Sequence, residues 1–463
     1  MESHDRVRPI LVMLVVGVGT LLSAMAGSAV TLALPRIGQE YGVSIGSAGW
    51  VVEAYLVAVT SLLLVAGRAS DAVGHRTIYL VGFGWFGLAS VACGFADNLE
   101  MLVAGRILQG VGGAMLMATA PALLTTAFPP SRRGFALGTV STATYVGLTV
   151  GPPLGGFLVT HASWRWVFFL NGPSALVVVG LGFVLLPTAA RAPRERWDVA
   201  GTLTLMAGLP FALVAIDQGH DWGWLSWRTL GAATGGVTLL GTFVWLELRC
   251  SDPLLQLRLF RSRQLTGATL SAVANYVALF ICIILIPYYL TEGLGLTSSA
   301  AGFLLSVQPV IMAIVASPSG RLSDRIGTRS LAVAGMLIFS AGMAGLATIG
   351  PTTPPGVVAI WLAVMGFGTG VFISPNSSAL MGAAPKHQQG VAAGVLAVAR
   401  NLGMMAGVAV SMSVFQAAGG RTARVWTDTE FAALRLALAI GSGVAFLGAF
   451  ASAIRSDSSS KSK

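Results

Sequence analysis

The chain has 463 residues, of which 55% are hydrophobic and 10% are charged, whereas an ordinary soluble domain carries about 25% charged residues. Its mean hydropathy is +0.78, and its apolar residues fall in runs of about 20, the length that a helix needs to cross a bilayer. These properties exclude a soluble enzyme and predict an all-α polytopic membrane protein with the lipid bilayer as a partner.

Fourteen apolar stretches of membrane-crossing length follow one another along the chain. They lie near residues 10–34, 48–70, 77–97, 100–127, 135–160, 164–186, 199–216, 229–247, 265–290, 298–317, 329–349, 355–381, 389–417 and 431–453. The first stretch could instead be a cleaved signal peptide, because Ala24-Met25-Ala26 resembles a small-residue cleavage site. The apolar run continues past this point to Pro35, which favours a membrane span.

Basic residues set the expected orientation. Most of the 28 Lys and Arg residues lie in the connections on the side of the N-terminus, and such residues are enriched in cytoplasmic loops. We therefore expect both termini in the cytoplasm. The net charge of +10 then reflects topology, and we expect no nucleic-acid partner because no folded basic domain is evident.

Several site types are not indicated by the sequence. The cysteines Cys93, Cys250 and Cys282 form no CxxC pair and the five histidines are scattered, so we expect no metal site. A phosphate-binding loop needs a Gly-Lys-Ser/Thr run, which the sequence lacks. We expect no cofactor, no ATP hydrolysis and no enzyme activity, since no catalytic groups cluster.

A loop motif occurs twice. Residues 67–76 read GRASDAVGHR and residues 320–329 read GRLSDRIGTR, and both follow an outside-to-inside span. Parallel repeats of this kind are typical of transporters. The alternative is a basic turn that recurs only to set topology.

At these residues the chain resembles the major facilitator superfamily, whose signature loop is Gly-x-x-x-Asp-x-x-Gly-x-Arg. The resemblance extends to Arg106-Ile107-Leu108-Gln109-Gly110 in the fourth span and to the stretch from Gly147 to Gly156 in the fifth, which looks like the motif of exporters. The first span departs from the family pattern, because Ala26 stands where the family usually has an acid.

The resemblance implies a major facilitator fold of two six-helix bundles with two extra helices between them, as in the drug:proton antiporters with 14 spans. The expected segments are a cytoplasmic N-terminus (1–9), an N-terminal bundle (10–186), a linker with two spans (187–264), a C-terminal bundle (265–453) and a cytoplasmic tail (454–463).

Proton coupling is assigned to Glu53 and Arg106. Of the acidic residues, Glu53 alone lies clearly within a predicted span, and ionisable groups in spans are functional candidates. We expect Glu53 and Arg106 to approach each other. A permanent pair would hold Glu53 ionised, so coupling requires the pair to loosen in one conformation or substrate to compete for one of its members. The alternative is that Glu53 merely anchors Arg106 or lies near the membrane interface.

Two further groups of residues are expected to act in transport. Gating is assigned to the loop repeats and to the glycines of the fifth span, which recur every four residues and therefore share one helix face: Gly67, Asp71, Gly74, Arg76, Gly147, Gly151, Pro152, Gly155, Gly320, Asp324, Gly327 and Arg329. Substrate contact is assigned to polar, aromatic or flexible side chains within spans: Tyr55, Tyr145, Asn275, Tyr276, Gln308, Phe372, Asn376, Arg400 and Met405. For most of these, ordinary packing is the alternative, and Arg400 could instead have a purely structural role.

Together these features predict a monomeric antiporter in the plasma membrane, which exports small amphipathic drugs or antibiotic-like compounds by rocker-switch alternating access with protons as the coupling ion. Alternatives are a dedicated exporter of an endogenous lipid, peptide or siderophore, and a proton-coupled importer. The arginine-rich, lysine-poor composition is typical of a high-GC bacterium.

Overall fold

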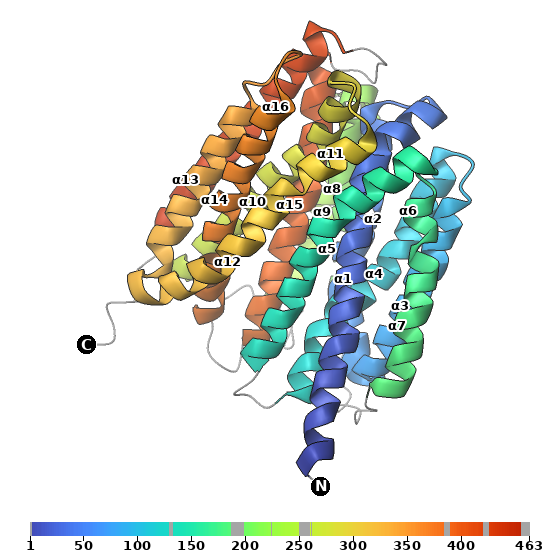
Figure 1. The fold of residues 1–463 in the computed structure, drawn as a ribbon, viewed down its shortest axis with the longest axis vertical. Coiled ribbons are helices and arrows are strands. Elements are labelled where there is room, and N and C mark those ends of the chain that lie inside the picture. Colours follow the sequence, from blue (N-terminus) through green and yellow to red (C-terminus); the bar gives the residue numbers. More distant parts are fainter. Residues whose placement is uncertain are drawn as a thin grey trace. The chain divides into compact units, whose positions relative to one another are not determined.

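The computed structural model describes residues 2–128, 133–186, 199–223, 225–249, 260, 262–383, 389–419 and 426–454. Within these residues every regular element is a helix (Figure 1). The predicted cytoplasmic segments 187–198, 250–259 and 455–463 lie outside the described residues.

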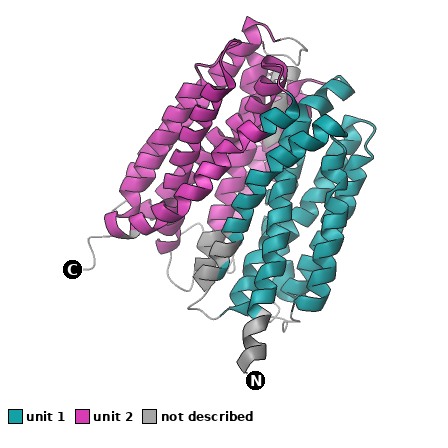
Figure 2. Cartoon of the chain, in the orientation of Figure 1, with its two compact units in different colours: residues 1–42, 50–206, 297–302 teal, residues 43–49, 207–296, 303–463 magenta. Residues whose placement is uncertain are grey.

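The chain divides into two compact units (Figure 2). Unit 1 comprises residues 1–42, 50–206 and 297–302, and unit 2 comprises residues 43–49, 207–296 and 303–463. The first of the two predicted extra spans is therefore shared between the units, whereas the second belongs to unit 2.

Unit 1 is built from long apolar helices and one short turn. They are α1 (Glu2–Tyr41), α2 (Ile45–Val73, from Trp50 onward), α3 (His75–Gly94), α4 (Leu99–Ala127), α5 (Arg133–His161), α6 (Trp166–Phe169), α7 (Asn171–Leu185) and the start of α8 (Val199–Trp222). A buried cluster that includes Val16, Phe83, Leu116 and Val178 joins α1, α3, α4 and α7.

Unit 2 holds the remaining helices. They are α9 (Trp227–Arg249), α10 (Arg263–Tyr288) with a π-helical turn η3 (Tyr289–Gly293), α11 (Ser298–Leu305, shared with unit 1), α12 (Val307–Ile326), α13 (Thr328–Leu346), α14 (Pro355–Gly382), α15 (Gln389–Ala417) and α16 (Asp428–Ala453). Helix α10 packs against α15 and α16, and α13 packs against α14.

The first helix continues beyond its predicted end. The predicted span ends near residue 34, but α1 runs to Tyr41 with Pro35 inside it. Proline lacks one amide donor, yet membrane helices tolerate it when packing supplies compensation. Leu34 and Ile37 on either side of it are fully buried, which indicates that packing holds the helix together here.

Helices occupy all fourteen predicted positions, but the expected count of fourteen spans is not confirmed. In the described part of the chain, twelve helices are long and apolar enough to cross a membrane. Helix α5 is not among the twelve, since its many Gly, Thr and Pro residues lower its hydropathy. For helix α8, the apolar segment found among the described residues is Ala200–Ile216.

The two copies of the loop motif fold alike. Helix α2 and α3 meet at Gly74 with φ 111°, and α12 and α13 meet at Gly327 with φ 90°. In each copy the serine hydroxyl donates to the carbonyl of the first glycine at 2.6 Å, from Ser70 to Gly67 and from Ser323 to Gly320. Shared backbone geometry of this kind supports the predicted internal repeat.

Replacing the second glycine of the motif should therefore destabilise the protein. We expect Gly74→Ala to cost about 1–3 kcal/mol, because a side chain strains backbone with positive φ. Gly67→Ala is the matched control: its Cβ would meet nothing within 4 Å, so it should be neutral or stabilising by about 0.5–1 kcal/mol. Thermal unfolding in detergent would measure both variants, and equal melting temperatures would contradict the prediction.

Candidate functional site

A buried guanidinium lies at the contact of α2 and α4 in unit 1. Arg106 is 3% exposed, and its Nε donates to the carbonyl oxygen of Val51 at 2.6 Å. Its Nη1 donates to Oε1 of Gln109. The guanidinium carbon also lies 4.4 Å from the ring centroid of Tyr55. These contacts satisfy the charge with dipoles and an aromatic face, so Arg106 needs no carboxylate to remain buried.

Glu53 is buried in the same unit, with 1% of its surface exposed. The contacts described for the Arg106 guanidinium are with Val51, Gln109 and Tyr55 rather than with Glu53. The expected approach of the two residues is not confirmed.

Helical phase explains this difference. Val51 and Tyr55 are four residues apart and lie on one face of α2, and this face is the one that contacts α4, since a Cβ at Gly110 would lie 2.8 Å from the Tyr55 carbonyl. Glu53 is two residues from each and therefore lies on a different face.

The three glycines of α5 all face α1. A Cβ would lie 2.5 Å from the Leu21 carbonyl oxygen at Gly147, 2.8 Å from that of Met25 at Gly151, and 2.7 Å from that of Ala29 at Gly155. The Ser28 hydroxyl adds a contact of 3.5 Å to the Gly147 carbonyl. The glycine face that the four-residue spacing predicts is thus closely packed, and α1 is the partner. Pro152 contacts α11, where a Cβ at Gly302 would lie 2.9 Å from its carbonyl carbon.

The loop-motif side chains have separate environments in the two copies. Asp71 is half exposed and lies 3.7 Å from the His75 ring, and Arg76 donates to the Phe183 carbonyl oxygen at 2.6 Å. Gly320 packs near the Ser374 hydroxyl. Arg329 begins α13, and the side chain of Asp324 is not among those that the structure describes. A latching role for these groups stays a prediction.

The expected substrate-contact residues are divided between the units. Tyr55 lies against Arg106 as described above, and Tyr145 lies half-buried on α5. In unit 2, Tyr276 on α10 packs against α15, where a Cβ at Gly403 would lie 2.8 Å from the Tyr276 Cβ. Arg400 is half-buried, and its Nε has no hydrogen-bond partner among the described residues.

The remaining candidates lie where helices pack. Phe372 is 1% exposed and its backbone meets Gly335 at the contact of α13 and α14. Asn376 donates to the Ala268 carbonyl at 3.2 Å, and Asn275 lies 3.6 Å from the Met336 sulfur. Met405 is fully buried. Gln308 is half-buried, and its backbone meets Gly366 at the contact of α12 and α14. These positions favour a packing role for Phe372 in particular.

Two residues with evident roles were not selected from the sequence. Gln109 fixes the Arg106 guanidinium, and its position in the Arg-x-x-Gln-Gly motif, three residues away on one helix face, was the available signal. Glu292 lies just beyond the predicted span 265–290, but it is 8% exposed in η3 and accepts a hydrogen bond from the Trp426 indole at 3.3 Å. No sequence pattern distinguishes it from a loop acid, because its burial depends on the distant Trp426.

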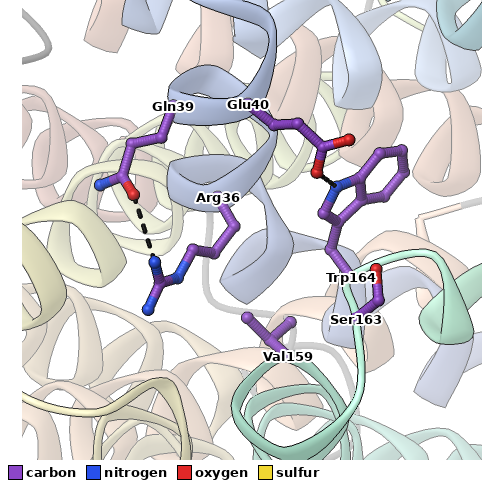
Figure 3. A pocket seen from close by; sticks show the side chains of 6 residues that line it. All are labelled: Arg36, Gln39, Glu40, Val159, Ser163 and Trp164. Carbon is purple, nitrogen blue, oxygen red and sulfur yellow. Dashed lines mark hydrogen bonds between the residues drawn. The ribbon is translucent and has the colours of Figure 1, made fainter. Parts of the chain in front are cut away.

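A cavity of about 330 Å³ opens at the C-terminal end of α1 (Figure 3). Its wall includes Glu40, whose carboxylate accepts from the Trp164 indole and from the Arg165 guanidinium, each at 2.6 Å. Figure 3 shows Arg36 and Gln39 joined by a hydrogen bond on the other side. The lining residues do not include Glu53 or Arg106, so this cavity is separate from the buried cluster.

The chain is similar to transporters in sequence. The family model of the Major Facilitator Superfamily matches residues 16–408 and 268–463. A relative described as riboflavin transporter RibZ from Clostridioides difficile is 30% identical, with 88% of each chain covered. The tetracenomycin C resistance and export protein of Streptomyces glaucescens is 32% identical, with 88% of this chain and 76% of the relative covered.

The fold is also similar to a solved structure. The human organic anion transporter MFSD10 superposes with a TM-score of 0.67 at 17% identity and covers 96% of this chain and 99% of its own. At this identity the likeness concerns the fold alone. On the family match and the relatives of 30% identity or more, the chain belongs to the major facilitator superfamily and is a membrane transporter rather than an enzyme.

Proposed function

We propose that this transporter is a proton-coupled exporter of small amphipathic drugs or antibiotic-like compounds, working by alternating access with a rocker-switch motion. The similarity to the tetracenomycin C resistance and export protein supports export of an antibiotic-like substrate. The expected setting is the plasma membrane of a high-GC bacterium, with both termini in the cytoplasm and the monomer as the working unit. Helices α5 and α8 complete fourteen spans in this proposal, as in the drug:proton antiporters.

The observation that carries proton coupling is the burial of an acidic side chain within a helix of unit 1. Glu53 is 1% exposed, and ionisable groups inside membrane spans are functional candidates. Arg106, on the neighbouring helix α4, has its own contacts with Val51, Gln109 and Tyr55. In this proposal Glu53 is the proton carrier.

Collapse of the proton gradient should abolish export. We expect cells that lack other pumps and express the chain to extrude amphipathic dyes or antibiotics, and a protonophore to return their accumulation to the level of cells without the chain. Fluorescent-dye accumulation measures this effect. Export that continues unchanged after the protonophore, with cellular ATP maintained, would contradict proton coupling.

A second candidate function is transport of one specific metabolite, favoured by the 30% identity to the riboflavin transporter RibZ. Uptake of labelled riboflavin by proteoliposomes containing the purified chain would support this alternative. Absence of such uptake, together with drug export in the same vesicles, would support the exporter.

A further inference from the structure

A second cavity, of about 430 Å³, lies between α8 and α9 in unit 2. Its walls are apolar: Phe211, Val214 and Trp222 come from α8, and Trp227 and Gly231 come from α9. Arg228 is the one charged residue among the described residues that line it. The volume falls within the ~300–1,000 Å³ range of small-molecule sites, so the cavity can hold a ligand of modest size.

The packing of the helix pair explains the cavity. Further along α9, its backbone is in close contact with the backbone of α8. A Cβ added at Gly236 would lie only 2.7 Å from the amide nitrogen of Ala212. At Gly231, one and a half turns nearer the connection of the helices, a Cβ would meet nothing within 4 Å. The helices therefore meet closely at one level and leave an open space at the level of Gly231.

This helix pair has the surface of a lipid-facing element. In the most apolar stretch of 18 residues in α9, 22% is buried inside the protein. This is the lowest share among the twelve candidate spans of the described chain. Leu225 and Trp227 at the connection are 87% and 79% exposed. Tryptophans at a span end mark the membrane–water interface, so the cavity begins at headgroup level and extends along the acyl-chain region.

The charge of the cavity selects among amphipathic ligands. The Arg228 guanidinium lies 5.5 Å from the Trp227 ring centroid, at the end of α9 that adjoins the connection. Arginine recognises phosphate by charge-assisted hydrogen bonds. A molecule with an anionic group at headgroup level and an apolar chain directed into the bilayer therefore complements Arg228 and the apolar walls of this cavity.

We propose that the α8–α9 cavity is a binding site for an anionic phospholipid, with one acyl chain against Phe211, Trp222 and Gly231 and the phosphate on Arg228. The residues that line this site do not include Glu53 or Arg106, so the proposal stands or falls independently of the exported substrate.

The test is a lipid titration of the full-length protein in detergent, followed by native mass spectrometry. We expect phosphatidylglycerol to bind more tightly than phosphatidylcholine with the same acyl chains. Arg228→Gln should weaken the binding of phosphatidylglycerol by about tenfold, the loss expected for one charge-assisted contact, and Arg228→Lys should recover part of it. Gly231→Leu should weaken both lipids, because it fills the cavity.

Helix α9 offers a matched control for each change. Arg249 also lies over a tryptophan, with its guanidinium 4.2 Å from the Trp245 ring, but it does not line the cavity. A Cβ at Gly241, as at Gly231, would meet nothing within 4 Å, and Gly241 lies outside the cavity wall. Arg249→Gln and Gly241→Leu should therefore leave phosphatidylglycerol binding unchanged.

Three outcomes would overturn the proposal. The first is equal binding of the two lipids, and the second is equal loss in the cavity variants and their controls, which would indicate general contact with the bilayer. The third is a Gly231→Leu variant that loses binding of an exported dye but keeps binding of phosphatidylglycerol, which would make the cavity a drug site. Melting temperatures measured in parallel show whether each variant is folded.

Discussion

The Glu53→Gln variant is expected to lose proton-driven export completely, falling to the background of vesicles without the protein. Glutamine has nearly the shape of a protonated glutamate but cannot release a proton. The side chain is 1% exposed in unit 1, so a proton taken up and released there crosses a region that water does not reach freely. Drug transport by inverted vesicles under an imposed pH gradient measures the loss.

A purely structural role for Glu53 predicts a different result. In the proposed mechanism, Glu53→Gln keeps the exchange of labelled for unlabelled substrate at zero pH gradient, because this exchange needs no net proton movement. Glu100→Gln is the matched control, since Glu100 is an exposed acid in the first turn of α4, and it should transport normally. Full gradient-driven export by Glu53→Gln would refute the assignment, and loss of exchange as well would indicate a structural role.

Local sequence patterns predicted much of the fold. The repeated motif at Gly67 and Gly320 marked two equivalent helix–helix turns, because glycine at Gly74 and Gly327 permits a positive φ. The four-residue spacing of Gly147, Gly151 and Gly155 predicted that these glycines share one face of a helix, since i and i+4 positions lie on the same side. These features depend on residues near one another in the chain.

Other features depend on contacts that no local pattern specifies. The expectation that Glu53 approaches Arg106 used depth in the membrane, but depth does not fix which face of α2 meets α4. Applying helical phase to Val51 and Tyr55 would still have required knowing which face α4 covers. The burial of Glu292 depends in the same way on Trp426, more than a hundred residues later in the chain.

The count of fourteen spans is not confirmed by hydropathy, for a related reason. Hydropathy identifies helices that face lipid, whereas α5 uses Gly and Pro to pack against α1. A helix that is selected for close contact with another helix loses the apolar residues by which a span is recognised. The same residues that lower the hydropathy of α5 are thus the ones assigned to gating.

The contact of α5 with α1 leads to the second large expected effect, in the variant Gly155→Val. A Cβ at this position would lie 2.7 Å from the carbonyl oxygen of Ala29 and 2.9 Å from its Cα. Both atoms belong to the backbone of α1, which cannot move aside as a side chain can. We expect destabilisation at or above the upper end of the ~1–3 kcal/mol range for overpacking, together with loss of export.

Gly27→Val is the matched control on the other helix of the pair, because a Cβ at Gly27 would meet nothing within 4 Å. Both changes place a β-branched residue in a helix, so their difference isolates the helix contact from helix propensity. Melting temperatures in detergent and dye export from cells measure the two effects. Since the predicted clash is with backbone, a Gly155→Val protein as stable and active as Gly27→Val would show that α1 and α5 do not make this contact in the working transporter.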